Sequence, residues 1–289
     1  SGEMDMNTRL KNSFLAAAAV CVCGAAAGQD NQPVFEVNYE GPRGTNTLEA
    51  INFGGGLRFK KFIYATAVTN FEGSSDSRDR GQTRIKRGPD SDVGPAPMNA
   101  PLATDDPSQI RQFEQVLAGV FQNTNLNNFL DNNTRNPHFS FVLELERPLR
   151  DDSEGDDDLV GEIIFFERGA QVANSFILLE ALDADGNVMG SPYLINPDSP
   201  IEMSPPVQAC VLGGANFDYR RSQDLGGVSI DLGKLGVSET SRIRVSRPVV
   251  GHDGMEGSML GGGRDLNPDF KLVFVQTYNV TLTHWAVGD

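Results

Sequence analysis

The stretch "FFERGAQVANSFILLEALDADGNVMGSPYLI" (Phe165–Ile195) contains apolar runs that are separated by polar residues and glycines. Its segment "DADGN" (Asp183–Asn187) stands between two of these runs. Glycine adopts a positive φ without steric cost, so an Asp-Gly pair between apolar runs is typical of a β-hairpin. We therefore predict core strands joined by a tight turn. The side chains that we expect to point inward are Phe165, Ile177, Leu179 and Val188.

The same segment does not fit the calcium loop of an EF-hand. Such a loop, if it began at Asp183, would need glycine at its sixth position and glutamate at its twelfth. Those two positions hold Val188 and Leu194. The hairpin is therefore the better interpretation of this stretch.

Short apolar runs with strand-like alternation continue on both sides. In "HFSFVLELE" (His138–Glu146) the apolar side chains fall on one face and the polar ones on the other, as in a half-buried strand. Many short strands broken by Gly, Pro, Asn and Asp predict an all-β fold, an antiparallel β-sandwich or jelly-roll-like domain. Further strands are expected at Val34–Tyr39, Leu48–Phe53, Arg58–Val68, Glu162–Glu167, Ser175–Leu182, Gly227–Leu232, Arg242–Ser246 and Phe270–Trp285.

One short helix interrupts this pattern. In "DPSQIRQFEQVLAGVFQ" the residues Ile110, Phe113, Leu117 and Val120 recur at helical spacing. Asp106 is a candidate N-cap, and proline at the next position suits the first turn of a helix.

The N-terminal residues resemble a secretory signal peptide. A short basic segment precedes an alanine-rich apolar run, and small residues follow before Gly28. We therefore predict a signal peptide at 1–28 and a single β-sandwich domain at 29–289, with long loops at 72–106 and 150–158. The apolar run is too short for a confident membrane span, so no stable span is expected after cleavage. An uncleaved anchor, or a lipid anchor at Cys21 or Cys23, is the alternative. These features predict a secreted protein, extracellular or at the cell surface.

Charge and cysteine content narrow the expected partners. The chain of 289 residues has a net charge of -15, and an acidic chain repels phosphate backbones, so nucleic acid is not an expected partner. Two of the three cysteines lie in the predicted signal peptide, which leaves Cys210 and no internal disulfide. Extracellular polysaccharide and other surface proteins remain the candidate partners.

Candidate binding residues fall in three places. The acidic loop "RDDSEGDDD" lies between two predicted strands, where Asp156, Asp157 and Asp158 could supply oxygen ligands to Ca²⁺. A solvated charge run is the alternative. Trp285 is a candidate sugar platform, or else packs the end of the last strand. Glu167 and Arg168 end a predicted strand and form either a ligand contact or a buried ion pair, of which the structural role is preferred.

The sequence contains none of the common catalytic motifs considered. The sequence contains no "HExxH", no "GxSxG", no paired-cysteine zinc pattern and no Walker motif. Acid pairs are abundant, so a hydrolase with two carboxylates stays compatible with the sequence without being indicated by it. We predict no enzymatic activity, no catalytic residues and no cofactor other than Ca²⁺.

Several segments follow one another in an informative order: "NLNNFLD", "FSFVLEL", "IIFFERGAQVANSFILLEALDADGNVMGSPYLI", "GGVSIDLGKLGVSETSRIRVS" and "NPDFKLVFV". Together they resemble the bacterial exosortase-dependent surface proteins, which are secreted β-sandwich proteins that often carry a PEP-CTERM sorting tail. The resemblance implies an exported domain that is displayed at the surface or released into a matrix, and it supplies no catalytic residues. Where that family typically has a Pro-Glu-Pro motif, an apolar span and basic residues, this sequence reads "THWAVGD" (Thr283–Asp289). We therefore expect release, or retention through other contacts.

These observations favour a non-enzymatic extracellular, cell-surface or matrix protein that presents loops on a β-sandwich. A lectin-like carbohydrate-binding module, calcium-dependent or not, is the main alternative, and a glycan-active hydrolase is a further one. An exposed aromatic face would favour the lectin, and a deep acidic cleft the hydrolase.

Overall fold

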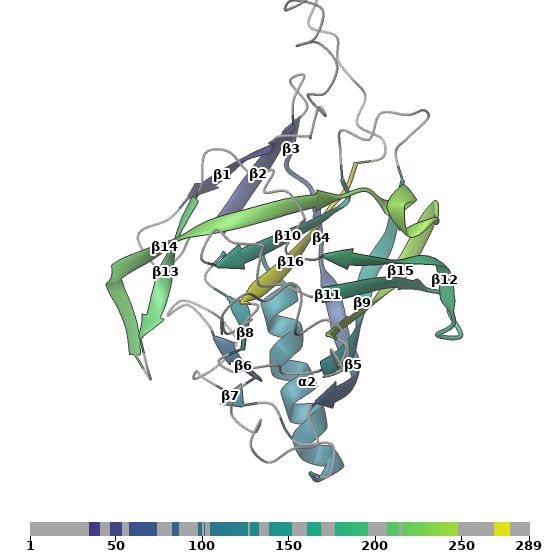
Figure 1. The fold of residues 1–289 in the computed structure, drawn as a ribbon, viewed down its shortest axis with the longest axis horizontal. Coiled ribbons are helices and arrows are strands. Elements are labelled where there is room, and N and C mark those ends of the chain that lie inside the picture. Colours follow the sequence, from purple (N-terminus) through teal and green to yellow (C-terminus); the bar gives the residue numbers. More distant parts are fainter. Residues whose placement is uncertain are drawn as a thin grey trace, which may run out of the picture. The chain divides into compact units, whose positions relative to one another are not determined.

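The part of the chain that the structure describes is built from antiparallel β-sheets and one α-helix, as the sequence predicts (Figure 1). The strand pairings of the described residues are all antiparallel. The predicted signal peptide lies outside the described residues. The computed structural model describes residues 35–40, 47–53, 58–73, 83–86, 98–99, 101, 105–126, 128–132, 139–151, 161–168, 177–195, 207–213, 216–247 and 269–277.

Three sheets make up the described domain. The five-stranded sheet has the order β12 (Val188–Ile195), β11 (Ile177–Leu182), β15 (Glu239–Arg247), β9 (Phe139–Arg150) and β5 (Ala65–Gly73). The eight-stranded sheet has the order β13 (Val207–Gly213), β14 (Asn216–Ile230), β10 (Ile163–Arg168), β16 (Phe270–Val275), β8 (Phe129–Asn132), β6 (Thr83–Lys86) and β7 (Met98–Asn99), with β4 (Phe62–Ile63) paired to β16. The three-stranded sheet has the order β1 (Phe35–Glu40), β2 (Thr47–Phe53) and β3 (Arg58–Phe59).

The eight-stranded sheet is the central layer of three. On β10, Ile163 and Phe165 belong to the core that this sheet shares with the five-stranded sheet, whereas Ile164 and Phe166 belong to a second core shared with the three-stranded sheet. All four side chains are fully buried. A strand covered on both faces has no polar side to show, which is why "IIFF" is a continuous apolar run instead of an alternating one.

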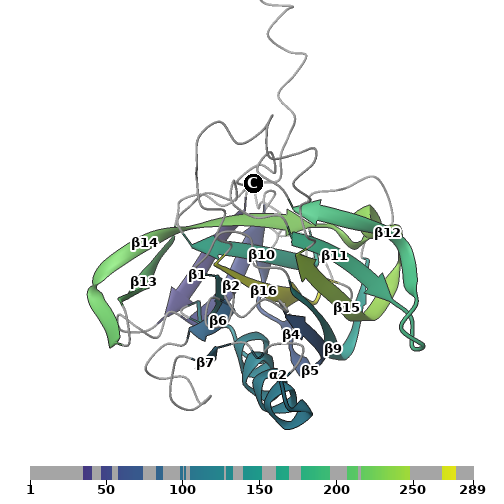
Figure 2. The same cartoon turned by 60° about the horizontal axis from the view of Figure 1, so that its bottom comes forward.

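Helix α2 (Pro107–Phe121) begins and packs as its sequence predicts. The Asp106 carboxylate accepts a hydrogen bond of 2.7 Å from the backbone N–H of Ser108, and Pro107 occupies the first turn. The apolar stripe, which includes Phe113 and Leu117, joins the core between the two larger sheets. Figures 1 and 2 both show the helix at one end of that core, between β5 on one side and β6 and β7 on the other.

The predicted Asp-Gly hairpin connects β11 to β12. Gly186 has φ 88°, and the Asp183 carboxylate accepts hydrogen bonds from the backbone N–H groups of Asp185 (2.9 Å) and Asn187 (2.8 Å). Phe165, Ile177 and Leu179 are fully buried as predicted. The prediction for Val188 is wrong, because 42% of this residue is exposed. Strand β12 is an edge strand, and β11 is its only strand neighbour among the described residues.

Two predicted boundaries also change. The single strand expected at Arg58–Val68 is divided among β3, β4 and β5. The segment 72–106, expected to be one loop, contains the end of β5 and the short strands β6 and β7. Strand β6 was missed because it has one apolar side chain among charged and polar neighbours, yet that side chain, Ile85, is fully buried.

Candidate functional site

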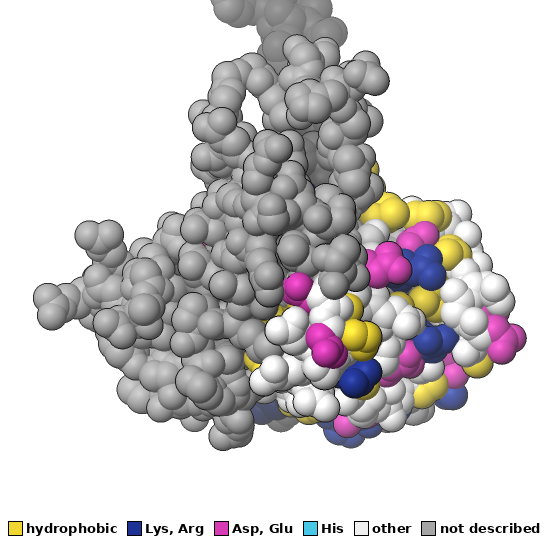
Figure 3. Space-filling view, turned by 90° about the horizontal axis from the view of Figure 1, so that it is seen from below, with side chains coloured by type: hydrophobic (Ala, Val, Ile, Leu, Met, Phe, Trp, Pro, Cys, Tyr) yellow, Lys and Arg dark blue, Asp and Glu magenta, His cyan; other side chains and the backbone are white. Residues whose placement is uncertain are grey.

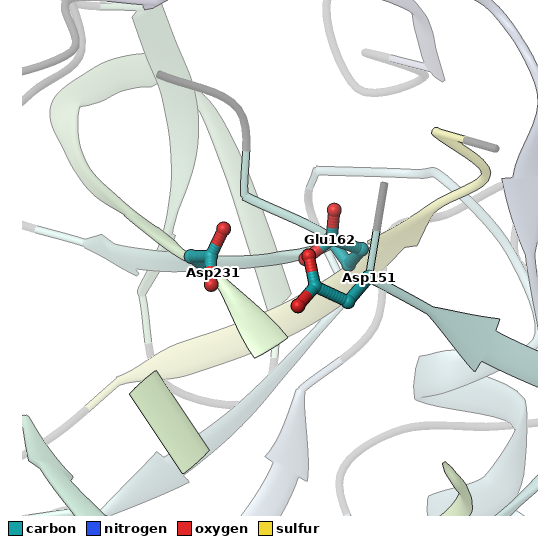
Figure 4. A group of neighbouring side chains, drawn as sticks. All are labelled: Asp151, Glu162 and Asp231. Carbon is teal, nitrogen blue, oxygen red and sulfur yellow. The ribbon is translucent and has the colours of Figure 1, made fainter. Parts of the chain in front are cut away.

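Three carboxylates from different strand ends meet at one place (Figure 4). Asp151 directly follows β9, Glu162 directly precedes β10, and Asp231 directly follows β14. One oxygen of each lies within 4.8 Å of the others. Strands β10 and β14 are neighbours with Ile163 opposite Ile230, so the acids just beyond this residue pair are brought to the same sheet end.

Glu162 is the most enclosed member of this acidic group. It is fully buried, and its Oε2 accepts a hydrogen bond of 2.9 Å from the backbone N–H of Leu232. Its Oε1 accepts a hydrogen bond of 3.0 Å from the hydroxyl of Thr277. These two donors hold the carboxylate in one orientation, which is the rigidity that a binding site needs.

Asp231 is fixed by the start of a short 3₁₀ helix, η3 (Leu232–Leu235). It is the N-cap residue, and its Oδ1 accepts a hydrogen bond of 2.6 Å from the backbone N–H of Gly233. A Cβ at position 233 would lie 2.7 Å from Asp231 Oδ1 and 3.4 Å from Asp151 Oδ2. Glycine at this position therefore leaves room for the two aspartates beside it.

The chemistry of the acidic group is that of a partial site for a hard cation. Ca²⁺ takes about six to eight oxygen ligands, so three carboxylates would supply part of its coordination, and backbone carbonyls or water would supply the rest. Like charges this close repel one another, and a bound cation would remove that repulsion.

The acidic group lies at the base of the loop in which the sequence predicts calcium ligands. Asp151 opens that loop, and Glu162 follows it. The predicted ligands Asp156, Asp157 and Asp158 lie outside the described residues. Glu162 and Asp231 were not predicted. Each is a single acid at the end of an apolar run, and only the pairing of β10 with β14 brings them together.

The other predicted binding residues are not part of this group. Glu167 is the second-to-last residue of β10 and is 1% exposed, so it lies in the protein interior. Its Oε2 has no hydrogen-bond partner among the described residues. The backbone of Arg168 pairs with Leu225, and its side chain is not described. Trp285 lies outside the described residues.

Glu167 faces a charge from the opposite sheet. Arg247 ends β15 on the same inward face as Ile243 and Val245, and it is 2% exposed. Burial raises the pKa of Glu167 well above its usual value, the charge of Asp269 raises it further, and Arg247 opposes both. Burial also lowers the pKa of Arg247 to about 10, and Glu167 opposes that shift. Arg247 is thus a described cation whose charge acts on Glu167. The predicted pairing of Glu167 with Arg168 falls on a side chain that is not described.

No family model, no curated protein and no solved structure matches this chain. Among the described residues, no helix has the length and apolar character needed to cross a membrane. Acidic and basic side chains are interspersed on the face of the described region shown in Figure 3, so this face has no single sign of charge.

Proposed function

We propose that this chain is a secreted, non-enzymatic protein of the cell surface or extracellular matrix, which presents loops on a rigid β scaffold. The observation that supports the proposal is that the acidic loop is connected at its two ends to strands of different sheets. Its two ends leave β9 in the five-stranded sheet and enter β10 in the central sheet, so it bridges the two layers of the main core.

Both ends of the acidic loop are anchored to other elements. At its start, the backbone N–H of Asp151 donates a hydrogen bond of 3.0 Å to the carbonyl of Ser238. At its end, Glu162 is held by Leu232 and Thr277. Functional loops are commonly carried by rigid scaffolds of this kind. The signal-like N-terminus and the resemblance to exosortase-dependent surface proteins support an extracellular location.

Location and ligand can be tested together. The full chain, expressed with its N-terminal segment in a bacterium, should be found in the outer fractions and lack residues 1–28. The mature chain is then tested on a panel of bacterial and algal polysaccharides, beside a variant whose loop acids at 151–158 are changed to their amides. Binding that requires the loop acids supports the proposal. Retention in the cytoplasm, or cleavage of any polysaccharide, contradicts it.

A calcium-dependent carbohydrate-binding module is the second candidate, and the acidic group of Asp151, Glu162 and Asp231 favours it. A cation held there would join the ends of β9, β10 and β14, and would fix the base of the acidic loop. A ligand that binds only the folded state at 100 times its dissociation constant stabilises that state by about 2.7 kcal/mol.

Thermal unfolding in Ca²⁺ and in EDTA tests this second candidate. We expect Ca²⁺ to raise the melting temperature of the wild type and to have no such effect on a Glu162→Gln, Asp231→Asn double variant. Asparagine is a good N-cap, so the second change preserves the start of η3. Glu180→Gln is the matched control, because it removes one carboxylate from the five-stranded sheet and should retain the Ca²⁺ response. An equal melting temperature of the wild type in Ca²⁺ and EDTA would exclude a calcium site.

A further inference from the structure

A buried lysine lies beside a side-chain amide at the end of helix α2. Lys271 is on β16 in the central sheet and is fully buried. Its Nζ donates a hydrogen bond to the carbonyl of Val120 in the last turn of α2 and lies 3.4 Å from Asn123 Oδ1. No described carboxylate accepts a hydrogen bond from this ammonium group, which is unusual because buried lysines are normally paired with an acid.

Asn123 is held in one orientation by its other hydrogen bonds. Its Oδ1 also accepts hydrogen bonds from the backbone N–H of Asn125 (2.9 Å) and from Nδ2 of Asn128 (3.2 Å), while its Nδ2 donates to the carbonyl of Gly119 (2.7 Å). A backbone N–H can only donate and a backbone carbonyl can only accept. The oxygen and nitrogen of this amide are therefore assigned by their partners.

This arrangement activates both groups for one reaction. Two donors other than the attacking lysine, the backbone N–H of Asn125 and Nδ2 of Asn128, polarise the carbonyl of Asn123 and would stabilise negative charge on its oxygen, as an oxyanion hole does. Burial lowers the pKa of Lys271 to about 7, so a substantial fraction of the amine is neutral near neutral pH. A neutral amine in an apolar site is a nucleophile.

We propose that Lys271 and Asn123 form an intramolecular amide bond between the side chains. Lys271 Nζ attacks Asn123 Cγ, and the electron pair of the carbonyl moves onto Oδ1. When the carbonyl re-forms, the bond from Cγ to Nδ2 breaks. The attacking nitrogen gives up one proton to Nδ2, which leaves as ammonia, so one amide replaces another and no oxidant or co-reactant is needed.

The two reacting atoms are near each other, but they must still approach. Asn123 Oδ1 lies 3.4 Å from Nζ, so Cγ, which is bonded to that oxygen, is at most about 4.6 Å from Nζ. Reacting groups in productive complexes lie about 3–3.5 Å apart, so the attack requires a further approach on the order of 1 Å. The bond would connect residues 148 positions apart and would fasten β16 to the turn that follows α2. Because no described acid is hydrogen-bonded to Nζ to relay the proton, the reaction is expected to be slow, and aged protein is the right sample.

The mass of the purified full chain, stored after folding and then denatured, is the first readout. We expect a product lighter than the sequence by one ammonia. Cyclisation of an N-terminal glutamine also loses ammonia, so the bond must be located by tryptic mapping. The peptide 112–135 should be joined to the peptide that begins at Asp265, and trypsin should not cut after the modified Lys271.

Variants separate the bond from ordinary hydrogen bonding. Lys271→Met and Asn123→Ala should each abolish the joined peptide, whereas Lys234→Met, which removes a lysine from η3, should leave it unchanged. Asn128→Ala removes one donor to Asn123 Oδ1 and should slow the accumulation of the joined peptide several-fold. If a variant does not fold, the tryptic map of the wild type still shows whether the bond between Lys271 and Asn123 has formed. Recovery of the unlinked 112–135 peptide, together with full cleavage after Lys271 in aged protein, would overturn the proposal.

Discussion

Two glutamates near the opposite ends of strand β10 have different surroundings: Glu162 directly precedes the strand, and Glu167 is its second-to-last residue. Glu162 and Glu167 are both buried, at 0% and 1% exposure. Glu162 meets a backbone N–H and a hydroxyl, one for each carboxylate oxygen. Glu167 has an oxygen that no described donor reaches. Burial alone therefore does not determine the protonation state of a carboxylate, because nearby hydrogen-bond donors and charges also shift its pKa.

The charges around the two glutamates also differ in sign. The described acids whose oxygens lie close to Glu162 are Asp151 and Asp231, so the charges grouped there have the same sign. The surroundings of Glu167 include an internal cation, because Arg247 lowers its pKa while burial and Asp269 raise it. One end of β10 is therefore suited to binding, and the other to holding two sheets together.

Removing the internal cation should have the largest effect on this comparison. Arg247→Met keeps an apolar side chain of similar length but leaves Glu167 buried without its opposite charge. Removing one member of a buried opposite-charge pair costs about 3–5 kcal/mol while the remaining group stays ionised. We expect a loss of this order in the free energy of unfolding, measured by urea denaturation at a pH above the folded-state pKa of Glu167, and a smaller loss at a pH where the raised pKa keeps Glu167 protonated.

Arg244→Met is the matched control for this change. Arg244 lies on the same strand as Arg247, but it is only partly buried and pairs with Glu180. The substitution Arg244→Met should lower the free energy of unfolding by about 1 kcal/mol or less. Equal losses for the two variants would contradict the inward pairing of Arg247 with Glu167.

A change of pH should alter stability through Glu167, with a smaller effect than the removal of Arg247. The folded-state pKa of Glu167 is raised above its ordinary value of 4.5, so the folded state retains a proton that the unfolded state releases. Wild-type stability should therefore fall as pH rises from about 4.5 through the folded-state pKa, by about 1.4 kcal/mol for each pKa unit of the shift. Glu167→Gln does not titrate and should lack this decrease.

Urea denaturation of the wild type and Glu167→Gln across that range provides the measurement. Glu180→Gln, on the five-stranded sheet, is the control and should follow the wild-type curve. Parallel curves for the wild type and Glu167→Gln would show that Glu167 has the same pKa folded and unfolded.

The contrast between the two glutamates was not visible in the sequence. In "EIIFFE" the two acids flank the same apolar run symmetrically, so the local sequence predicts the same environment for both. Their environments come from residues far along the chain: Asp231 after β14 for Glu162, and Arg247 at the end of β15 for Glu167.

The secondary structure was more accessible to prediction. Alternation in β9 and the capped stripe of α2 are local patterns, and both were predicted. The exposure of Val188 was missed because it depends on which strand lies at the sheet edge. The sequence therefore predicts periodic elements well, but it predicts poorly the contacts that depend on strand order.

The smallest expected effect is the coupling of the ion pair between Glu180 and Arg244. Arg244 Nη1 lies 3.2 Å from Glu180 Oε2, and their side chains are 32% and 14% exposed for Arg244 and Glu180 respectively. A double-mutant cycle with alanine at both positions should give a coupling of about 0.2–1 kcal/mol, and solvent access should make it weaker still in 1 M salt, where the screening length is about 3 Å. The equivalent cycle for Glu167 and Arg247 should give a larger coupling that salt changes little. If salt weakened both couplings equally, Arg247 would have to be accessible to solvent, and the two ends of β10 would differ less than their burial indicates.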